Sequence, residues 1–172
     1  MEITREHTTA TTPHPGRYQI DPASSVVRFR TRHMFGLAPV RGRFAVRAGT
    51  VDVTEPLTAS RISADIETAS FRTRNSARDA SVRSSRFLAA DQYPVISFSS
   101  TGLDGRVLAG TVTVRDVTRP VSLLVELSDV SPRAFTARAT IRIDRAEFGV
   151  TAQRGLAGRY LDLSVEARCV RS

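Results

Sequence analysis

Hydrophobic and polar side chains alternate along most of this chain. Over residues 25–33 the alternation places Val27 and Phe29 on one face and Arg28, Arg30 and Arg32 on the other. Successive side chains of a strand point to opposite faces, so the pattern predicts a strand with one buried and one solvated side. The same alternation recurs over residues 40–47, 62–68, 95–100, 108–115, 121–127, 135–144 and 161–169.

The number of these segments predicts the fold class. Eight or nine such strands with short connections form an antiparallel sheet that has one solvated side. A sheet of this length must curl or pack to bury its apolar face, and an up-and-down barrel does so without leaving edges. We therefore predict an all-β, lipocalin-like up-and-down antiparallel β-barrel of about eight strands, with a turn or bulge at Gly49-Thr50.

Small residues recur on the inward face of the predicted barrel. They are Gly42, Ala64, Gly110, Ala137, Ala139 and Ala167. A barrel of about eight strands can be filled by side chains or can hold one small ligand. The small residues favour a lined cavity, and a packed sandwich core remains the alternative.

One helical insertion is expected, over Ser76–Leu88. Ser76 and Asp79 form a capping-box pattern, which satisfies free amide groups at a helix start. Asp79 and Arg83 are four residues apart, in the order that favours an ion pair on a helix. Proline disfavours helix at the residue before it, so Tyr93-Pro94 ends the segment.

Composition and charge narrow the classes of partner. All 25 basic residues are arginine, and the formal net charge is +8. Nucleic-acid binders gather basic residues into a patch or stripe. Here the arginines are spread along the chain without an aromatic-rich basic motif, so no nucleic-acid partner is predicted.

The N-terminal residues 1–16 are polar and rich in Thr and Pro. This composition predicts a disordered segment, followed by a single barrel domain over residues 17–172. The segment lacks the apolar stretch of a secretory signal, and no run reaches the ~18 apolar residues of a transmembrane helix. The cytoplasm is therefore the expected compartment.

Few residues are candidates for catalysis, disulfide formation, metal binding or contact with a polar headgroup. The single cysteine, Cys169, excludes an internal disulfide and is expected in the core. His33 has no nucleophile or orienting acid that the sequence can assign to it, so it is interpreted as structural or as a headgroup contact. Arg78, Arg83 and Arg145 are expected in local ion pairs, or alternatively at the barrel mouth against a polar or pyrophosphate headgroup. No metal site, cofactor or Gly-rich phosphate loop is predicted.

A set of short motifs follows in order along the chain: Tyr18, Asp21-Pro22, Phe29, His33, Gly42-x-Phe44, Arg78-Asp79, Tyr93-Pro94, Val117-Thr118-Arg119-Pro120, Ile143-Asp144-Arg145 and Phe148-Gly149. In these motifs the chain resembles the YceI-like family of lipocalin-like, polyisoprenoid-binding proteins, over about residues 17–170. The resemblance implies an extended barrel with a helical insertion and an apolar pore that carries isoprenoid chains. The chain departs from the family at Ser24-Ser25, where His-Ser is common, and at Asp116, where Gly is usual.

Together these observations predict a binding protein rather than an enzyme, with no catalytic residue. The expected ligand is a long-chain isoprenoid or related lipid, such as a polyprenyl, isoprenoid quinone or acyl chain, held in the apolar interior as a carrier or store. The expected ligand-binding residues are Phe29, His33, Phe44, Ile62, Ile66, Arg78, Phe87, Phe98, Val112, Val125, Ala139 and Ile141.

Two other functions stay open at this stage. One is an enzyme that acts on a small hydrophobic substrate in the barrel using His33. The other is a ligand-free interaction module that uses the Arg-rich outer face. The expected partner is a hydrophobic small molecule or lipid; a transient membrane contact and a homodimer stay open. As a further hypothesis, the helix, with Phe87 and Leu88 turned inward, gates the pore.

Overall fold

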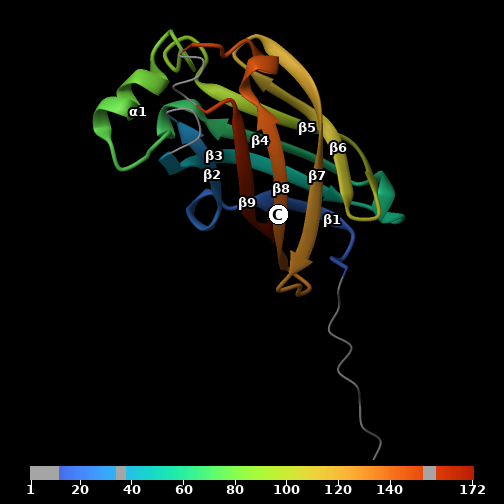
Figure 1. The fold of residues 1–172 in the computed structure, drawn as a ribbon. Helices are drawn as coiled ribbons and strands as arrows, with labels where there is room; N and C mark the ends of the chain where they lie inside the picture. Colours follow the sequence, from blue (N-terminus) through green and yellow to red (C-terminus); the bar gives the residue numbers. More distant parts are fainter. Residues whose placement is uncertain (1–11, 34–37, 153–157) are drawn as a thin grey trace, which may run out of the picture.

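The computed structural model describes residues 12–33, 38–152 and 158–172 (Figure 1). The strands are β1 (Gly16–Ile20), β2 (Val26–His33), β3 (Ala38–Val53), β4 (Arg61–Glu67), β5 (Val95–Asp104), β6 (Val107–Val114), β7 (Val117–Ser128), β8 (Ala134–Asp144) and β9 (Tyr160–Arg171). The helices are α1 (Ser76–Arg83) and the 3-10 turns η1 (Pro22–Ser24), η2 (Leu57–Ala59), η3 (Thr68–Ser70) and η4 (Arg145–Phe148). Within the described ranges, no helix is long and apolar enough to cross a membrane.

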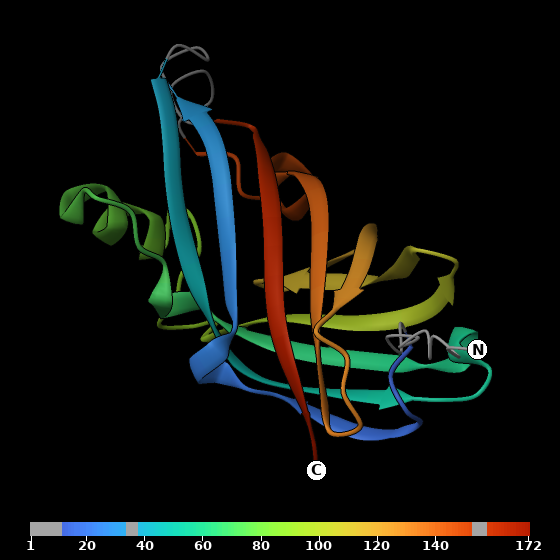
Figure 2. The ribbon, with the colours of Figure 1, turned by 90° about the horizontal axis from the view of Figure 1, so that it is seen from below.

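The strands close into an up-and-down barrel, which confirms the predicted fold class. Each strand from β2 to β9 pairs antiparallel with the next one, and β9 pairs back onto β2. These eight strands therefore form a ring without a free edge. Figures 1 and 2 show the ring from two directions, with α1 outside it on the side of β3.

The first two strands are two halves of one interrupted strand. Both run antiparallel to β3 on one side and to β9 on the other, β1 near one end of the barrel and β2 towards the other end. Between them the Asp21 side chain accepts hydrogen bonds from the Ala23 amide and the Ser24 hydroxyl, at 3.1 and 2.9 Å. This local cap bends the chain at η1, so that both halves stay in the ring.

The residues just before Arg17 contact the barrel. β1 begins at Gly16, and Pro13 is buried. The Tyr18 hydroxyl donates a hydrogen bond to the His14 carbonyl at 2.8 Å. Residues 1–11 of the expected disordered segment lie outside the described residues.

The irregularity in β3 lies elsewhere than at Gly49-Thr50, so that prediction is wrong in position. β3 continues to Val53, and its register against β4 shifts between Val46 and Ala48. The shift falls where β3 leaves β2 and begins to pair with β4. Gly49 instead makes room, since a Cβ there would collide with the side chain of Ile20.

The helix is shorter than expected and is capped differently. It ends at Arg83, and Asn75 rather than Ser76 is its N-cap, with a side chain that accepts a hydrogen bond from a first-turn amide at 3.0 Å. Asp79 accepts hydrogen bonds from the amide and hydroxyl of Thr73, at 2.9 and 2.6 Å. Arg83 donates to the Phe71 carbonyl at 2.6 Å. The expected capping box and helical ion pair are therefore replaced by bonds that tie α1 to the preceding loop.

Candidate functional site

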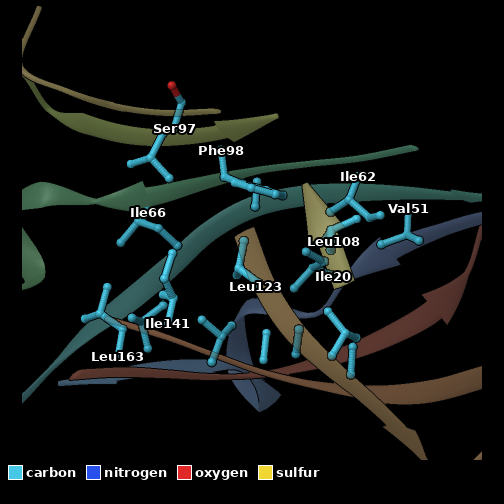
Figure 3. A pocket seen from close by; sticks show the side chains of 18 of the residues that line it. Ile20, Val51, Ile62, Ile66, Ser97, Phe98, Leu108, Leu123, Ile141 and Leu163 are labelled. Carbon is cyan, nitrogen blue, oxygen red and sulfur yellow. The ribbon is translucent and has the colours of Figure 1, made fainter. Parts of the chain in front are cut away.

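A cavity of about 730 Å³ occupies the interior of the barrel. Every second side chain of a strand points inward, so all nine strands contribute to its wall. Figure 3 shows side chains from different strands converging on it, among them Ile62, Phe98, Leu123 and Ile141. The volume falls within the roughly 300–1,000 Å³ of small-molecule sites.

Partial exposure of the inward side chains shows that the interior is unfilled. On β8, Phe135 is buried, whereas Ala137, Ala139 and Ile141 on the same face are only half-buried. The inward residues of β7 are half-buried as well. In a close-packed core these alternate positions would all be buried. The prediction of a lined cavity, rather than a packed sandwich core, therefore matches the structure.

The small inward residues do not all create space. Ala64, Ala137 and Ala139 line the cavity directly. In contrast, a Cβ on Gly110 would lie 2.6 Å from the Phe98 ring, and a Cβ on Gly42 would collide with the ring of Phe29. These two glycines make room for phenyl rings from the neighbouring strands.

One end of the barrel, here called the aromatic end, is covered by two segments. Phe87 follows α1, Phe148 ends η4 and Val150 lies two residues further on; all three are buried together. Leu88 reaches the cavity wall. Arg145 donates hydrogen bonds to the Gly158 and Val150 carbonyls, at 2.8 and 3.0 Å, and its guanidinium lies 5.6 Å from the centre of the Phe87 ring. This end is closed by apolar packing around one hydrogen-bonded arginine.

The other end, here called the polar end, opens to solvent. Leu57, Leu103 and Gly105 line the cavity there. Arg106 and Glu126 also line it, form an ion pair with each other, and leave more than half of each side chain exposed. Side chains that touch both the cavity and the solvent mark a mouth, so a ligand can enter at the polar end.

The wall offers little reactive chemistry. Its charged residues are Arg106, Glu126 and Arg145, and the first two pair with each other. Burial raises the pKa of the Cys169 thiol to about 12, so at neutral pH it is a protonated core group. In the described part of the chain, no three His, Cys, Asp or Glu side chains are grouped to hold a metal. The cavity is built to take up an apolar molecule.

Eight of the twelve expected ligand-binding residues lie on the cavity wall. They are Phe44, Ile62, Ile66, Phe98, Val112, Val125, Ala139 and Ile141. The structure thus brings together residues from β3 to β8 that are up to about a hundred positions apart, because the barrel closes. Their role in ligand binding stays a prediction.

Three others lie off the wall. Phe29 is buried behind it and stacks on Phe71 with ring centres 5.0 Å apart. Phe87 belongs to the closure of the aromatic end. Arg78, on α1, donates to the Thr73 hydroxyl at 3.1 Å. His33 ends β2, and its side chain lies outside the described residues.

Several residues of the cavity wall are not among the predicted ligand-binding residues. Leu123, Leu163 and Val165 stood on the inward face of the pattern and could have been chosen from it. Arg106 and Glu126 could not, because nothing in the alternation indicates that the β5–β6 turn and the C-terminal part of β7 meet at a mouth. Leu88 was expected to point inward and does.

Comparison with known proteins finds a matching family model and related sequences. A family model described as a YceI-like domain matches residues 18–169. Protein YceI of Salmonella arizonae is 27% identical over 168 residues, which cover 90% of this chain and 86% of that protein.

Two solved structures have a similar fold. The chain superposes on BcnA of Burkholderia cenocepacia with a TM-score of 0.74 at 18% identity, covering 87% of this chain and 98% of BcnA. It superposes equally well, with a TM-score of 0.74 at 13% identity, on a polyisoprenoid binding domain from Saccharophagus degradans, covering 92% of this chain and all of that domain. With a family model that spans nearly the whole chain, the protein belongs to the YceI-like family.

Proposed function

We propose that the protein binds a long-chain isoprenoid or related lipid in its barrel and acts as a carrier or store. The observation that carries this proposal is the ring of half-buried apolar side chains around a cavity of about 730 Å³. When a ligand covers apolar groups that contact solvent, the burial stabilises the complex by about 2.5 kcal/mol for each ~100 Å² buried. The Saccharophagus degradans domain of the same fold, which is described as polyisoprenoid binding, supports the proposal.

The wall chemistry favours a tail over a polar ligand. Apart from the charged residues at its two ends, the wall is almost wholly aliphatic and aromatic, with Ser60 and Ser97 as its hydroxyl groups. A polar ligand would lose its hydrogen bonds to water without replacing them. A polyprenyl, quinone or acyl chain has no such bonds to lose, and binding it requires no catalysis.

Native mass spectrometry of gently purified protein tests the proposal, followed by organic extraction and identification of the lipid. The expected result is a discrete extra mass that matches an isoprenoid, quinone or fatty acyl species. Protein without extra mass, which also takes up no added isoprenoid, would contradict the proposal.

A matched pair of variants locates the ligand. Ala139→Trp places an indole inside the cavity, and Thr140→Trp places the same group on the exposed face of the same strand. We expect Ala139→Trp to lose bound lipid while keeping the circular dichroism spectrum of a barrel, and Thr140→Trp to retain the lipid. If both variants carry as much lipid as the wild type, the ligand does not occupy this cavity.

The proposal also predicts that His33 catalyses no reaction. His33→Ala is expected to hold as much lipid as the wild type, and neither protein should alter added isoprenoids over time. Product formation by the wild type that is lost in His33→Ala would instead support the enzyme alternative.

A further inference from the structure

The outer face of the β2–β3 hairpin places arginines opposite arginines. Arg28 lies opposite Arg43, and Arg30 lies opposite Arg41. An isolated bridge, with two main-chain hydrogen bonds of 2.9 and 3.0 Å, then puts Arg72 on the other side of Arg43. Residues directly opposite each other in antiparallel strands point to the same face. These five exposed residues, here called the arginine face, therefore form adjacent rows of positive charge.

Five other exposed arginines have acidic partners. Ion pairs join Arg17 to Asp52 at 2.8 Å, Arg138 to Glu166 at 3.3 Å, Arg142 to Asp162 at 2.9 Å and Arg159 to Asp144 at 2.9 Å, and a further pair joins Arg106 to Glu126. The alternation of sign across β8 and β9 is the arrangement expected of a stable outer face. The arginine face departs from it.

The carboxylates that border the arginine face are already engaged. Asp162 lies opposite Arg30 on β9, but it accepts two hydrogen bonds from Arg142, at 2.9 and 3.3 Å. Glu166 is shared between Arg138 and Arg28, with the Arg28 distance at 3.8 Å. Arg41 and Arg43 form no ion pair with any carboxylate in the described ranges.

Such an arrangement becomes favourable when an anionic surface covers it. Like charges directly opposite each other on a sheet are destabilising. Neighbouring strands lie ~4.8 Å apart and alternate residues of one strand ~6.7 Å apart, so the guanidinium groups extend in two directions over the face. This grid matches a surface with many phosphates better than one small anion, and each guanidinium fork suits phosphate oxygens.

The chemistry of the face distinguishes a bilayer from nucleic acid. The outward positions of β2 and β3 next to the arginines hold Val26, Pro39 and Ala45 and present no aromatic ring on which a base could stack. A lipid surface requires no such ring, because it is recognised through phosphate charge alone.

We propose that the arginine face docks the protein on an anionic phospholipid bilayer. This inference deepens the proposed function and rests on it, since a carrier of a membrane-derived chain must visit a bilayer to load or release its cargo. Charge complementarity between the arginine face and the lipid phosphates provides the attraction.

Vesicle co-sedimentation of the full chain tests the docking. The wild type should partition onto phosphatidylcholine vesicles that contain phosphatidylserine, remain free with pure phosphatidylcholine vesicles, and be released at high salt, where the Debye length falls to about 3 Å. The double variant Arg41→Gln/Arg43→Gln should partition about ten- to thirtyfold more weakly. The control Arg61→Gln/Arg133→Gln removes the same charge from exposed residues outside the arginine face and should change partitioning by less than about threefold.

The outcomes separate docking from cargo binding. Both double variants should co-purify with as much lipid as the wild type, because none of the four arginines lines the cavity. Equal loss of vesicle binding in the two double variants would overturn the proposal, since net charge alone would then explain it. So would an absence of binding to the anionic vesicles, or displacement from them by stoichiometric duplex DNA. Vesicle binding by a protein that takes up no isoprenoid would retain the docking and reject the cargo.

Discussion

Two walls of the same barrel follow the same alternation and yet differ in packing. The packed wall consists of nine buried inward residues of β1 to β3: Tyr18, Ile20, Val27, Phe29, Val40, Phe44, Val46, Val51 and Val53. The open wall consists of half-buried inward residues of β5 to β8: Ile96, Phe98, Val112, Leu123, Val125, Ala137, Ala139 and Ile141. Periodicity decides which side chains point inward, and their size and neighbours decide whether they fill the interior.

Aromatic contacts explain the difference. On the packed wall Phe29, Phe44 and Phe71 form one cluster, with ring centres 5.0 to 5.9 Å apart. Tyr18 meets Phe135 edge to face at 4.9 Å. Rings at these separations add to the free energy of burial and leave little space between them. The open wall has a single ring, Phe98, among aliphatic side chains that line the cavity.

The largest expected effect comes from removing an aromatic ring from the packed wall. Phe29→Ala should lower the free energy of unfolding by about 3–5 kcal/mol, because the ring is buried among Phe44 and Phe71. The same substitution on the open wall, Phe98→Ala, should cost roughly half as much, since part of that ring already borders the cavity. Urea unfolding of both variants measures the difference. Equal losses would show that the two walls are packed alike.

A glycine substitution tests the close approach of Phe29 to β3. A Cβ on Gly42 would collide with the Phe29 ring and would lie 2.5 Å from the Arg72 carbonyl oxygen, which belongs to the backbone and cannot rotate away. Gly42→Ala should therefore destabilise the protein by about 1–3 kcal/mol. Gly102→Ala is the control, because no atom lies within 4 Å of its added Cβ, and thermal unfolding should place it within about 0.5 kcal/mol of the wild type.

The pH dependence of the free energy of unfolding tests the burial of Cys169, which lies on β9. Burial raises the pKa of its thiol from its ordinary 9.0 to about 12. The protonated thiol contributes its full stability below pH 9.0, and this contribution is lost as the pH rises towards about 12, because only the unfolded chain ionises in that window. The loss should be about 1 kcal/mol per pH unit. Urea unfolding of wild type and Cys169→Ala at several alkaline pH values measures it; parallel curves would contradict a buried thiol.

The barrel itself could be predicted from the sequence because it depends on a period of two. Arg28, Phe29 and Arg30 assign their faces without any tertiary information. The same reasoning placed Phe98, Ala139 and Ile141 on the wall, where the structure has them. Closure followed from the number of strands, since an open sheet of this length would leave its apolar face in water.

Features that depend on side-chain size or on contacts between distant segments could not be predicted. Gly42 and Gly110 look like empty space in the pattern, yet each receives a ring from a neighbouring strand. The barrel mouth was the alternative position for Arg78, but its side chain donates a hydrogen bond to Thr73 instead. Arg43 and Arg72 lie opposite each other because of an isolated bridge, which no local sequence pattern predicts. Periodicity carries no information about these long-range pairings.

The smallest effect provides the most direct comparison, because one substitution is made in both walls. Ile20 is buried against Gly49 on the packed wall, and Ile141 is half-buried on the open wall. Ile20→Val should cost about 0.5–1.5 kcal/mol, the usual result of deleting one methylene from a filled core. Ile141→Val should cost less than about 0.5 kcal/mol in ligand-free protein, because the lost group mostly contacts open cavity.

The same pair then distinguishes empty space from a loosely packed core. With a saturating isoprenoid the ligand fills the cavity, so Ile141→Val should lose a contact with it and the cost of this substitution should rise. The cost of Ile20→Val should rise less, because that side chain also borders the cavity but is already buried against Gly49. Urea unfolding with and without the isoprenoid measures both costs. If the ligand changes neither of them, the half-buried wall does not contact it, and the exposure of Ile141 reflects loose packing alone.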